Sequence, residues 1–162
     1  MDSPAPVLKP DMTKPYMWVA TWFGCGLMRP APGTWGTIGA LPFAILLKVA
    51  GGWPLLLAAL VLVTLAGYWA AGQYEKDSNT HDSGIIVIDE VAGVWLTLLF
   101  VPLTPLTILA GFLLFRFFDI LKPWPVSWCD KKVGGALGVM ADDIAAGIYA
   151  AIVLGILNHY VF

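Results

Sequence analysis

The chain has 162 residues, of which 59% are hydrophobic and only 12% are charged, and its mean hydropathy is +0.78. Soluble domains average about a quarter charged residues, so this composition excludes a water-soluble fold and indicates an integral membrane protein. The formal net charge is −2 and the chain has no basic run, which excludes nucleic acid as a partner. The length fits one domain over residues 1–162.

The first 50 residues predict a peripheral segment followed by a helix. Residues 1–15 are polar and rich in proline, and we interpret them as a flexible arm. Residues 16–28 contain Tyr16, Trp18 and Trp22, whose amphipathic rings favour an interfacial helix on the membrane surface. Residues 29–39 predict a turn, after which Thr34 would cap a helix that runs to about residue 50.

Long apolar segments occupy most of the remaining chain. Residues 54–72 are almost wholly apolar and approach the ~20 residues that cross a bilayer. Residues 85–101 and 103–121 predict a helical hairpin, residues 144–162 a final span, and residues 73–83 and 122–140 polar loops. Within the final span, Gly147, Ala151 and Gly155 recur every four residues, which favours close helix packing. The sequence therefore predicts an all-α bundle of about four to five short transmembrane helices.

Positive charges indicate how this bundle is oriented. Seven of them fall in segments that alternate crossing assigns to one face: Lys9, Lys14, Arg29, Lys76, Lys122, Lys131 and Lys132. By the positive-inside rule this face is cytoplasmic. Lys48 is the exception, and we expect its side chain to reach the opposite interface.

Carboxylates converge on the same face. Asp89 and Glu90 begin one predicted span, Asp119 ends the next, and Asp142 and Asp143 begin the last. Carboxylates at the edge of the hydrocarbon are costly, so a set of five predicts a compensating cation. Mg²⁺ is the expected ion because it prefers hard oxygen ligands.

A structural interpretation of these carboxylates also exists. Acidic residues at helix N-termini are favoured by the helix dipole, and Asp142 would serve as an N-cap. This explanation does not extend to Asp119 near a helix C-terminus, although a simple Arg116–Asp119 ion pair is an alternative.

Several neighbouring residues favour phosphate chemistry. Arg116 and Lys122 are expected to face a phosphate group. Gly33, Thr34 and Thr37 would offer backbone N–H groups and hydroxyls at a helix N-terminus, although glycines for turns and packing explain them equally well. His81, beside Asp82, would relay a proton or act only as a solvated loop residue.

No covalent nucleophile is evident in the sequence. Cys25 and Arg29 are too close for a C-x5-R cysteine phosphatase loop, and no D-x-D-x-[TV] motif occurs. Metal-activated water that attacks phosphorus is therefore the simpler mechanism.

Four ordered blocks carry a resemblance to a known family. The segments PAPGTWGT (30–37), HDSGIIVIDEVAG (81–93), FRFFDILKPWP (115–125) and GGALGVMADDIAAG (134–147) together resemble the phosphatidylglycerophosphatase A family. The resemblance implies a Mg²⁺-dependent phosphatase of the bacterial inner membrane, with its active site on the cytoplasmic face. Such an enzyme removes the terminal phosphate of phosphatidylglycerophosphate and leaves phosphatidylglycerol.

The resemblance also assigns residues. The family's acidic motif falls on Asp89 and Glu90, and its D-D pair falls on Asp142 and Asp143. Its R-x-x-D-x-x-K-P block falls on Arg116, Asp119, Lys122 and Pro123. Asp82 also matches an acid of the family.

Two other classes compete with the phosphatase prediction. A small transporter would also carry acids within the membrane, but it should place polar groups along the whole span rather than at one face. A CDP-alcohol phosphotransferase would share metal and acids, but its D-G-x-x-A-R block is absent from the sequence. The sequence does not predict an oligomeric state.

Overall fold

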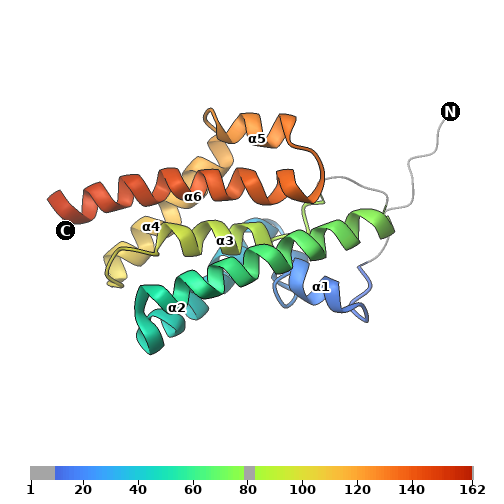
Figure 1. Ribbon diagram of the computed structural model, residues 1–162, viewed down its shortest axis with the longest axis horizontal. Helices are drawn as coiled ribbons and strands as arrows, with labels where there is room; N and C mark the ends of the chain where they lie inside the picture. The colour runs from blue at the N-terminus through green and yellow to red at the C-terminus, as the bar shows by residue number, and fades with distance from the viewer. Residues whose placement is uncertain (1–9, 79–82, 162) are drawn as a thin grey trace.

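The computed structural model describes residues 10–78 and 83–161, and within these ranges it is helical and contains no strand (Figure 1). The elements in chain order are α1 (Pro15–Ala20), a 3-10 turn (Cys25–Leu27), α2 (Pro32–Ser78), α3 (Ile88–Thr97), α4 (Pro105–Leu121), α5 (Val126–Lys132) and α6 (Gly135–Tyr160). The predicted all-α class is therefore confirmed.

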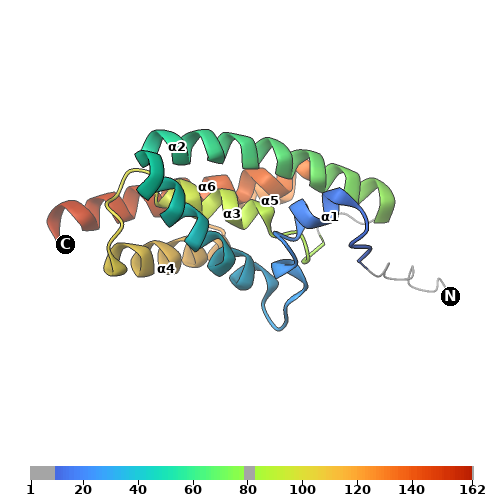
Figure 2. The ribbon, with the colours of Figure 1, turned by 90° about the horizontal axis from the view of Figure 1, so that it is seen from below.

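Helix α2 consists of two limbs that run in opposite directions (Figure 2). The reversal occurs at Gly51 and Gly52, whose backbone angles are not helical. Gly52 has a φ of 69°, which a residue without Cβ adopts at little cost. The predicted end of the first helix at about residue 50 is thus confirmed. Thr34, in contrast, is not a cap, because α2 already begins at Pro32, whose fixed φ suits a first helical position.

Helix α3 is shorter than the predicted span over residues 85–101. It has 10 residues, which at 1.5 Å each give about 15 Å, half of the ~30 Å hydrocarbon core. The start of α3 is fixed by a neighbour, since the Val87 N–H donates to the Ala20 carbonyl at 2.8 Å. Most of α3 is buried between α2 and α6. The predicted hairpin therefore has one short arm.

Lys48 holds the other end of α3. Its Nζ donates to the Leu98 carbonyl at 2.9 Å and also to the Val101 carbonyl. Its ammonium group satisfies carbonyls that the end of a short helix leaves without intrahelical partners. The expectation that this side chain reaches the opposite interface stays a prediction.

We expect Lys48→Met to lower the free energy of unfolding by about 1–3 kcal/mol, because buried carbonyls would lose their donor. Thermal unfolding of the detergent-purified protein measures this effect. Leu46→Met is a suitable control, since Leu46 lies on the same limb and is 65% exposed. Equal melting temperatures for the two variants would contradict the role of Lys48.

Helix α6 begins earlier than predicted. Residues 122–140 were expected to form a loop, but they contain α5 and the first turns of α6, which starts at Gly135. The N-cap is Gly134, so the expectation that Asp142 caps the last helix was wrong. Asp142 and Asp143 instead lie about two turns inside α6, and both are buried.

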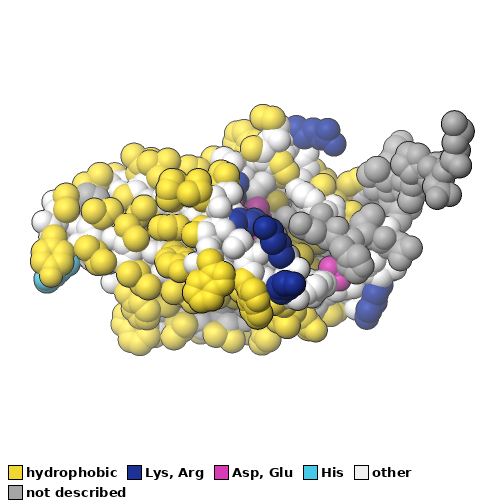
Figure 3. All heavy atoms as spheres, turned by 90° about the horizontal axis from the view of Figure 1, so that it is seen from above, with side chains coloured by type: hydrophobic (Ala, Val, Ile, Leu, Met, Phe, Trp, Pro, Cys, Tyr) yellow, Lys and Arg dark blue, Asp and Glu magenta, His cyan; other side chains and the backbone are white. Residues whose placement is uncertain are grey.

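Within residues 10–78 and 83–161, two helices, α2 and α6, are long and apolar enough to cross a membrane. Only 17% and 39% of their most apolar windows are buried, whereas the core helix of a soluble protein would be mostly buried. Figure 3 shows hydrophobic side chains over most of one face and charged side chains gathered toward one end. The predicted four to five spans are not confirmed, and the interfacial position of α1 stays a prediction.

Candidate active site

The described segments that carry the predicted acids meet at one end of the bundle. The beginnings of α3 and α6 and the last turn of α4 lie on the same side, opposite the Gly51–Gly52 reversal (Figures 1 and 2). Gly93 of α3 and Gly147 of α6 allow this approach, since a Cβ added at Gly147 would lie 2.6 Å from the Gly93 oxygen. The close packing predicted for Gly147 is confirmed, whereas Gly155 has nothing within 4 Å of an added Cβ.

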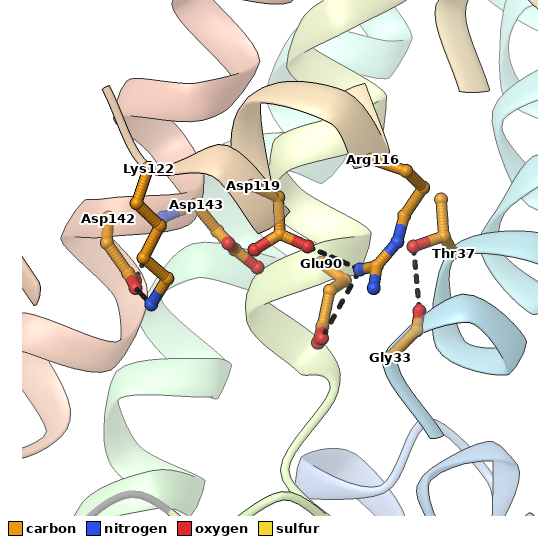
Figure 4. A network of polar contacts seen from close by, with 8 residues as sticks. All are labelled: Gly33, Thr37, Glu90, Arg116, Asp119, Lys122, Asp142 and Asp143. Carbon is orange, nitrogen blue, oxygen red and sulfur yellow. Dashed lines mark hydrogen bonds and ion pairs between the residues drawn. The ribbon is translucent and has the colours of Figure 1, made fainter. Parts of the chain in front are cut away.

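A cavity of about 360 Å³ opens at this end. The structure brings all five predicted carboxylates to its lining: Asp89, Glu90, Asp119, Asp142 and Asp143. Figure 4 shows four of these side chains together with Arg116 and Lys122. Acidic groups from three helices therefore share one enclosed space.

Three of the carboxylates form the tightest group. One oxygen from each of Asp89, Glu90 and Asp143 lies within 4.8 Å of the other two. Oδ1 of Asp89 and Oε2 of Glu90 are buried and have no hydrogen-bond partner in the described part of the chain. Buried carboxylate oxygens without donors are costly, and the donor set is entirely hard oxygen. These residues fit a divalent cation such as Mg²⁺.

Arg116 lies beside this group and pairs with one of its acids, Glu90, and with the neighbouring Asp119. Its Nη1 is 3.7 Å from Glu90 Oε1 and also donates to Asp119 Oδ2, one turn along α4 (Figure 4). The Arg116–Asp119 ion pair, an alternative left open by the sequence, is therefore present. Asp119 lines the cavity, but its carboxylate pairs with Arg116. The two buried oxygens of Asp89 and Glu90, in contrast, have no hydrogen-bond partner among the described residues.

Lys122 forms a second ion pair at the rim of the cavity. It ends α4 with a φ of 46°, and its Nζ donates to Asp142 Oδ2 at 2.8 Å. The other oxygen of Asp142 accepts the Asp143 N–H at 2.9 Å. Asp142 therefore holds an ammonium group over the cavity and bonds to the backbone of its neighbour.

We expect Arg116→Gln to lower the free energy of unfolding by roughly 2–3 kcal/mol, because Glu90 and Asp119 would face each other without a counter-charge. This expected loss of stability is smaller than the loss when a fully buried ion pair is broken, because Glu90 and Asp119 line a cavity. Urea or thermal unfolding in detergent gives the change. The double variant with Asp119→Asn should recover part of the loss, and a double variant as unstable as the sum of both single changes would contradict this explanation.

The residues predicted to bind phosphate through a helix N-terminus lie beside the cavity rather than in its lining. A Cβ added at Gly33 would clash with the Glu90 carboxylate, so α2 approaches the site closely there. Thr37 is buried and donates its hydroxyl to the Gly33 carbonyl at 2.8 Å. Thr34 is partly buried. A phosphate role for Gly33, Thr34 and Thr37 stays a prediction, and His81 and Asp82 lie outside the described residues.

One acidic lining residue was missed from the sequence. Glu75 lies near the end of α2 and lines the same cavity. Residues 73–83 were interpreted as a loop, whereas α2 continues to Ser78 and carries Glu75 to the site. The sequence did carry a signal for Glu75. It lies four residues after Ala71, so a helix that continued past residue 72 would place both side chains on the same face.

Exposed apolar helices and a cavity lined by buried carboxylates define a membrane-type helical protein with a candidate divalent-cation site. Residues 18–158 match the family model described as Phosphatidylglycerophosphatase A. The chain belongs to the phosphatidylglycerophosphatase A family, so the resemblance carried by the four blocks is confirmed.

Individual relatives agree with this family. The chain is 39% identical to a phosphatidylglycerophosphatase A of Escherichia coli strain K12, over 92% of this chain and 87% of the relative. It is also 39% identical to a phosphatidylglycerophosphatase A of Haemophilus influenzae, over 96% of both chains. A Bacteroides thetaiotaomicron protein, provisionally named as a phosphatidylinositol-3-phosphatase, is 39% identical over 85% of this chain and 90% of its own length. No solved structure gives a significant match.

Proposed function

We propose that this chain hydrolyses the terminal phosphate monoester of phosphatidylglycerophosphate to phosphatidylglycerol and inorganic phosphate. A water oxygen forms a bond to phosphorus, the bond from phosphorus to the glycerol oxygen breaks, and the glycerol oxygen takes up a proton. The observation that carries the proposal is the group of Asp89, Glu90 and Asp143 in a chain of this family. These carboxylates line a cavity at one end of the bundle, which supports a site for a polar head group.

We further propose that Asp89, Glu90 and Asp143 hold Mg²⁺. A bound Mg²⁺ would neutralise the carboxylates, lower the pKa of a bound water and stabilise negative charge on the phosphate. Support comes from the hard-oxygen ligand set and from the two buried oxygens without donors. Asp119 and Asp142, also predicted as metal ligands, bind Arg116 and Lys122, so we assign them the positioning of these cations.

Lys122 is the cation that we propose for direct contact with the phosphate. It lines the cavity, and Asp142 holds its Nζ at the rim. An ammonium group pairs with phosphate oxygens as a point charge and needs no fixed orientation. Arg116 lies behind Glu90 and Asp119, and its guanidinium group offsets the negative charge of these two carboxylates.

We also propose a multi-pass arrangement of four to five short spans in the bacterial inner membrane, with the site on the cytoplasmic face. The apolar and largely exposed helices α2 and α6 support the membrane location. Lys76 and Lys122 lie near the end of the bundle that carries the site, which supports the cytoplasmic face by the positive-inside rule.

Phosphate release from defined lipids tests the reaction. The detergent-purified protein is incubated separately with phosphatidylglycerophosphate, phosphatidylinositol 3-phosphate and phosphatidic acid, and the lipid products are identified by mass spectrometry. We expect phosphatidylglycerol as the main product, with the first lipid giving the highest kcat/KM. A preference for phosphatidylinositol 3-phosphate would overturn the proposed substrate, and no release from any lipid would overturn the phosphatase.

The metal requirement is tested in the same assay. We expect excess chelator to abolish phosphate release and added Mg²⁺ to restore it. Full activity after exhaustive chelation would contradict the proposed Mg²⁺ role while leaving the phosphatase reaction intact.

A further inference from the structure

The site cavity adjoins two further cavities along α2 and α6. It shares Glu75, Gly134 and Gly135 with a neighbouring cavity of about 400 Å³ at the end of α2. That cavity in turn shares Tyr68 and Leu137 with a hollow of about 510 Å³ farther along the two helices. Shared lining residues thus place the three spaces next to one another along α2 and α6, and we call the three together the α2–α6 crevice.

The polarity of the α2–α6 crevice changes along its length. Carboxylates line the site end, and the middle part contains Gln73 and the exposed ammonium group of Lys76. The far part is lined almost entirely by apolar side chains, including Leu65 and Ile148, both of which are exposed. The polar end, the cationic middle and the apolar open end follow one another in the same order as the terminal phosphate, the phosphodiester and the acyl chain of the lipid.

The length of the crevice also suits a lipid. Along α6 its lining runs from Gly135 to Ile148, which at 1.5 Å per residue is about 20 Å. One leaflet of the hydrocarbon core is roughly 15 Å deep. An acyl chain that starts near the site could therefore remain along the crevice through its own leaflet.

We propose that the α2–α6 crevice receives the acyl chain of the phosphomonoester lipid whose head group is hydrolysed at the carboxylates. This inference rests on the proposed function. The substrate enters sideways from the bilayer between α2 and α6, and the Lys76 ammonium lies near its phosphodiester. Chain burial in the crevice contributes to substrate affinity because apolar surface packs against Leu65, Met140 and Ile148.

A second apolar groove provides the alternative route. It has a volume of about 400 Å³, lies between α1 and the two limbs of α2, and is lined by residues such as Trp22, Phe43 and Trp95. One of its lining residues, the fully buried Ile88, is the neighbour of Asp89 in the chain. No described residue lines both this groove and the site cavity, whereas the α2–α6 crevice includes the carboxylates in its lining.

Photo-cross-linking of the unaltered protein distinguishes these routes. Phosphatidylglycerophosphate with a diazirine near the end of one acyl chain is illuminated with the protein in nanodiscs, and labelled peptides are identified by mass spectrometry. We expect label on residues 65–68 and 137–148 that decreases with excess unlabelled phosphatidylglycerophosphate but not with excess phosphatidylcholine. Competable label around Trp22 and Phe43, or label on α2 and α6 that no competitor reduces, would overturn the inference.

Turnover is measured in the same nanodiscs. Phosphate release with competable label elsewhere overturns the crevice and leaves the proposed function standing. Absence of phosphate release overturns the proposed function, and the crevice inference with it.

A pair of variants on α6 gives an independent test. Ile148→Trp narrows the apolar end of the crevice, whereas Ile152→Trp alters an equally exposed isoleucine one turn away that lies outside its lining. The quantity measured is kcat/KM for a long-chain substrate divided by kcat/KM for a short-chain substrate. We expect Ile148→Trp to lower this ratio by about tenfold, which corresponds to two methylenes of the long chain that are no longer buried. An unchanged ratio, or the same change in both variants, would overturn the inference.

Discussion

Asp89→Asn should reduce phosphate release by more than about 100-fold while the protein remains folded. Loss of a group that only orients a metal ligand costs 10–100-fold, so loss of a proposed ligand should cost more. Asn keeps the volume of the side chain but removes the charge that a cation requires. Phosphate release from phosphatidylglycerophosphate at saturating Mg²⁺, together with thermal unfolding, measures both effects.

Stability provides a second signature of the same variant. In chelator, one oxygen from each of Asp89, Glu90 and Asp143 lies within 4.8 Å of the other two, and Arg116, 3.7 Å from Glu90, is the cation beside them, so removing one negative charge should maintain or raise the melting temperature. Asp77→Asn is the matched control, because Asp77 is an exposed acid on α2 that pairs with Lys14 at 2.6 Å. This control should retain activity. Equal activity of Asp89→Asn and Asp77→Asn would contradict a site at the carboxylates.

Gly147→Val should disrupt the site without changing any of its polar groups. A Cβ at Gly147 would lie 2.6 Å from the Gly93 oxygen, a backbone atom that cannot rotate away, so α3 and α6 must separate. Asp89 and Asp143 each lie four residues before these glycines, on the same helix faces, and would move apart with them. We expect a loss of about 100-fold in phosphate release, as for a 1 Å misplacement, and of about 1–3 kcal/mol in stability.

Gly155→Val is the control for this prediction. Gly155 lies on α6 as well, but an added Cβ would meet nothing within 4 Å. The substitution should therefore leave phosphate release and the melting temperature almost unchanged. If both valine variants lose activity equally, close packing of α3 on α6 is not what aligns the carboxylates.

The convergence of the acids could be predicted from the sequence because it depends only on how often the chain reverses direction. Apolar segments separated by turns place Asp89, Asp119 and Asp143 at one end whatever the exact helix boundaries. Which of these acids pair with a cationic side chain could not be predicted. Whether an acid meets a cation depends on local geometry, such as the left-handed backbone of Lys122 that accompanies its contact with Asp142.

Helix boundaries were the least predictable part of the fold. The segment before Asp142 is rich in glycine and resembled a loop, yet it is helical from Gly135, and its Ala136 and Met140 lie against Gly72 and Gly67 of α2. Helix α3 resembled a full span, but contacts from distant residues, Ala20 at its start and Lys48 at its end, fix a helix of 10 residues. Neither contact is visible in local sequence patterns.

Direct binding of a divalent cation tests the central claim, which is that the carboxylates of Asp89, Glu90 and Asp143 form the catalytic metal site. Electron paramagnetic resonance of free Mn²⁺, titrated with the purified and chelator-treated protein, gives the number and affinity of bound ions. We predict saturable binding to the unaltered protein and to Asp77→Asn that is lost in Asp89→Asn. Identical Mn²⁺ binding by the unaltered protein and Asp89→Asn, or binding by neither, would contradict the account.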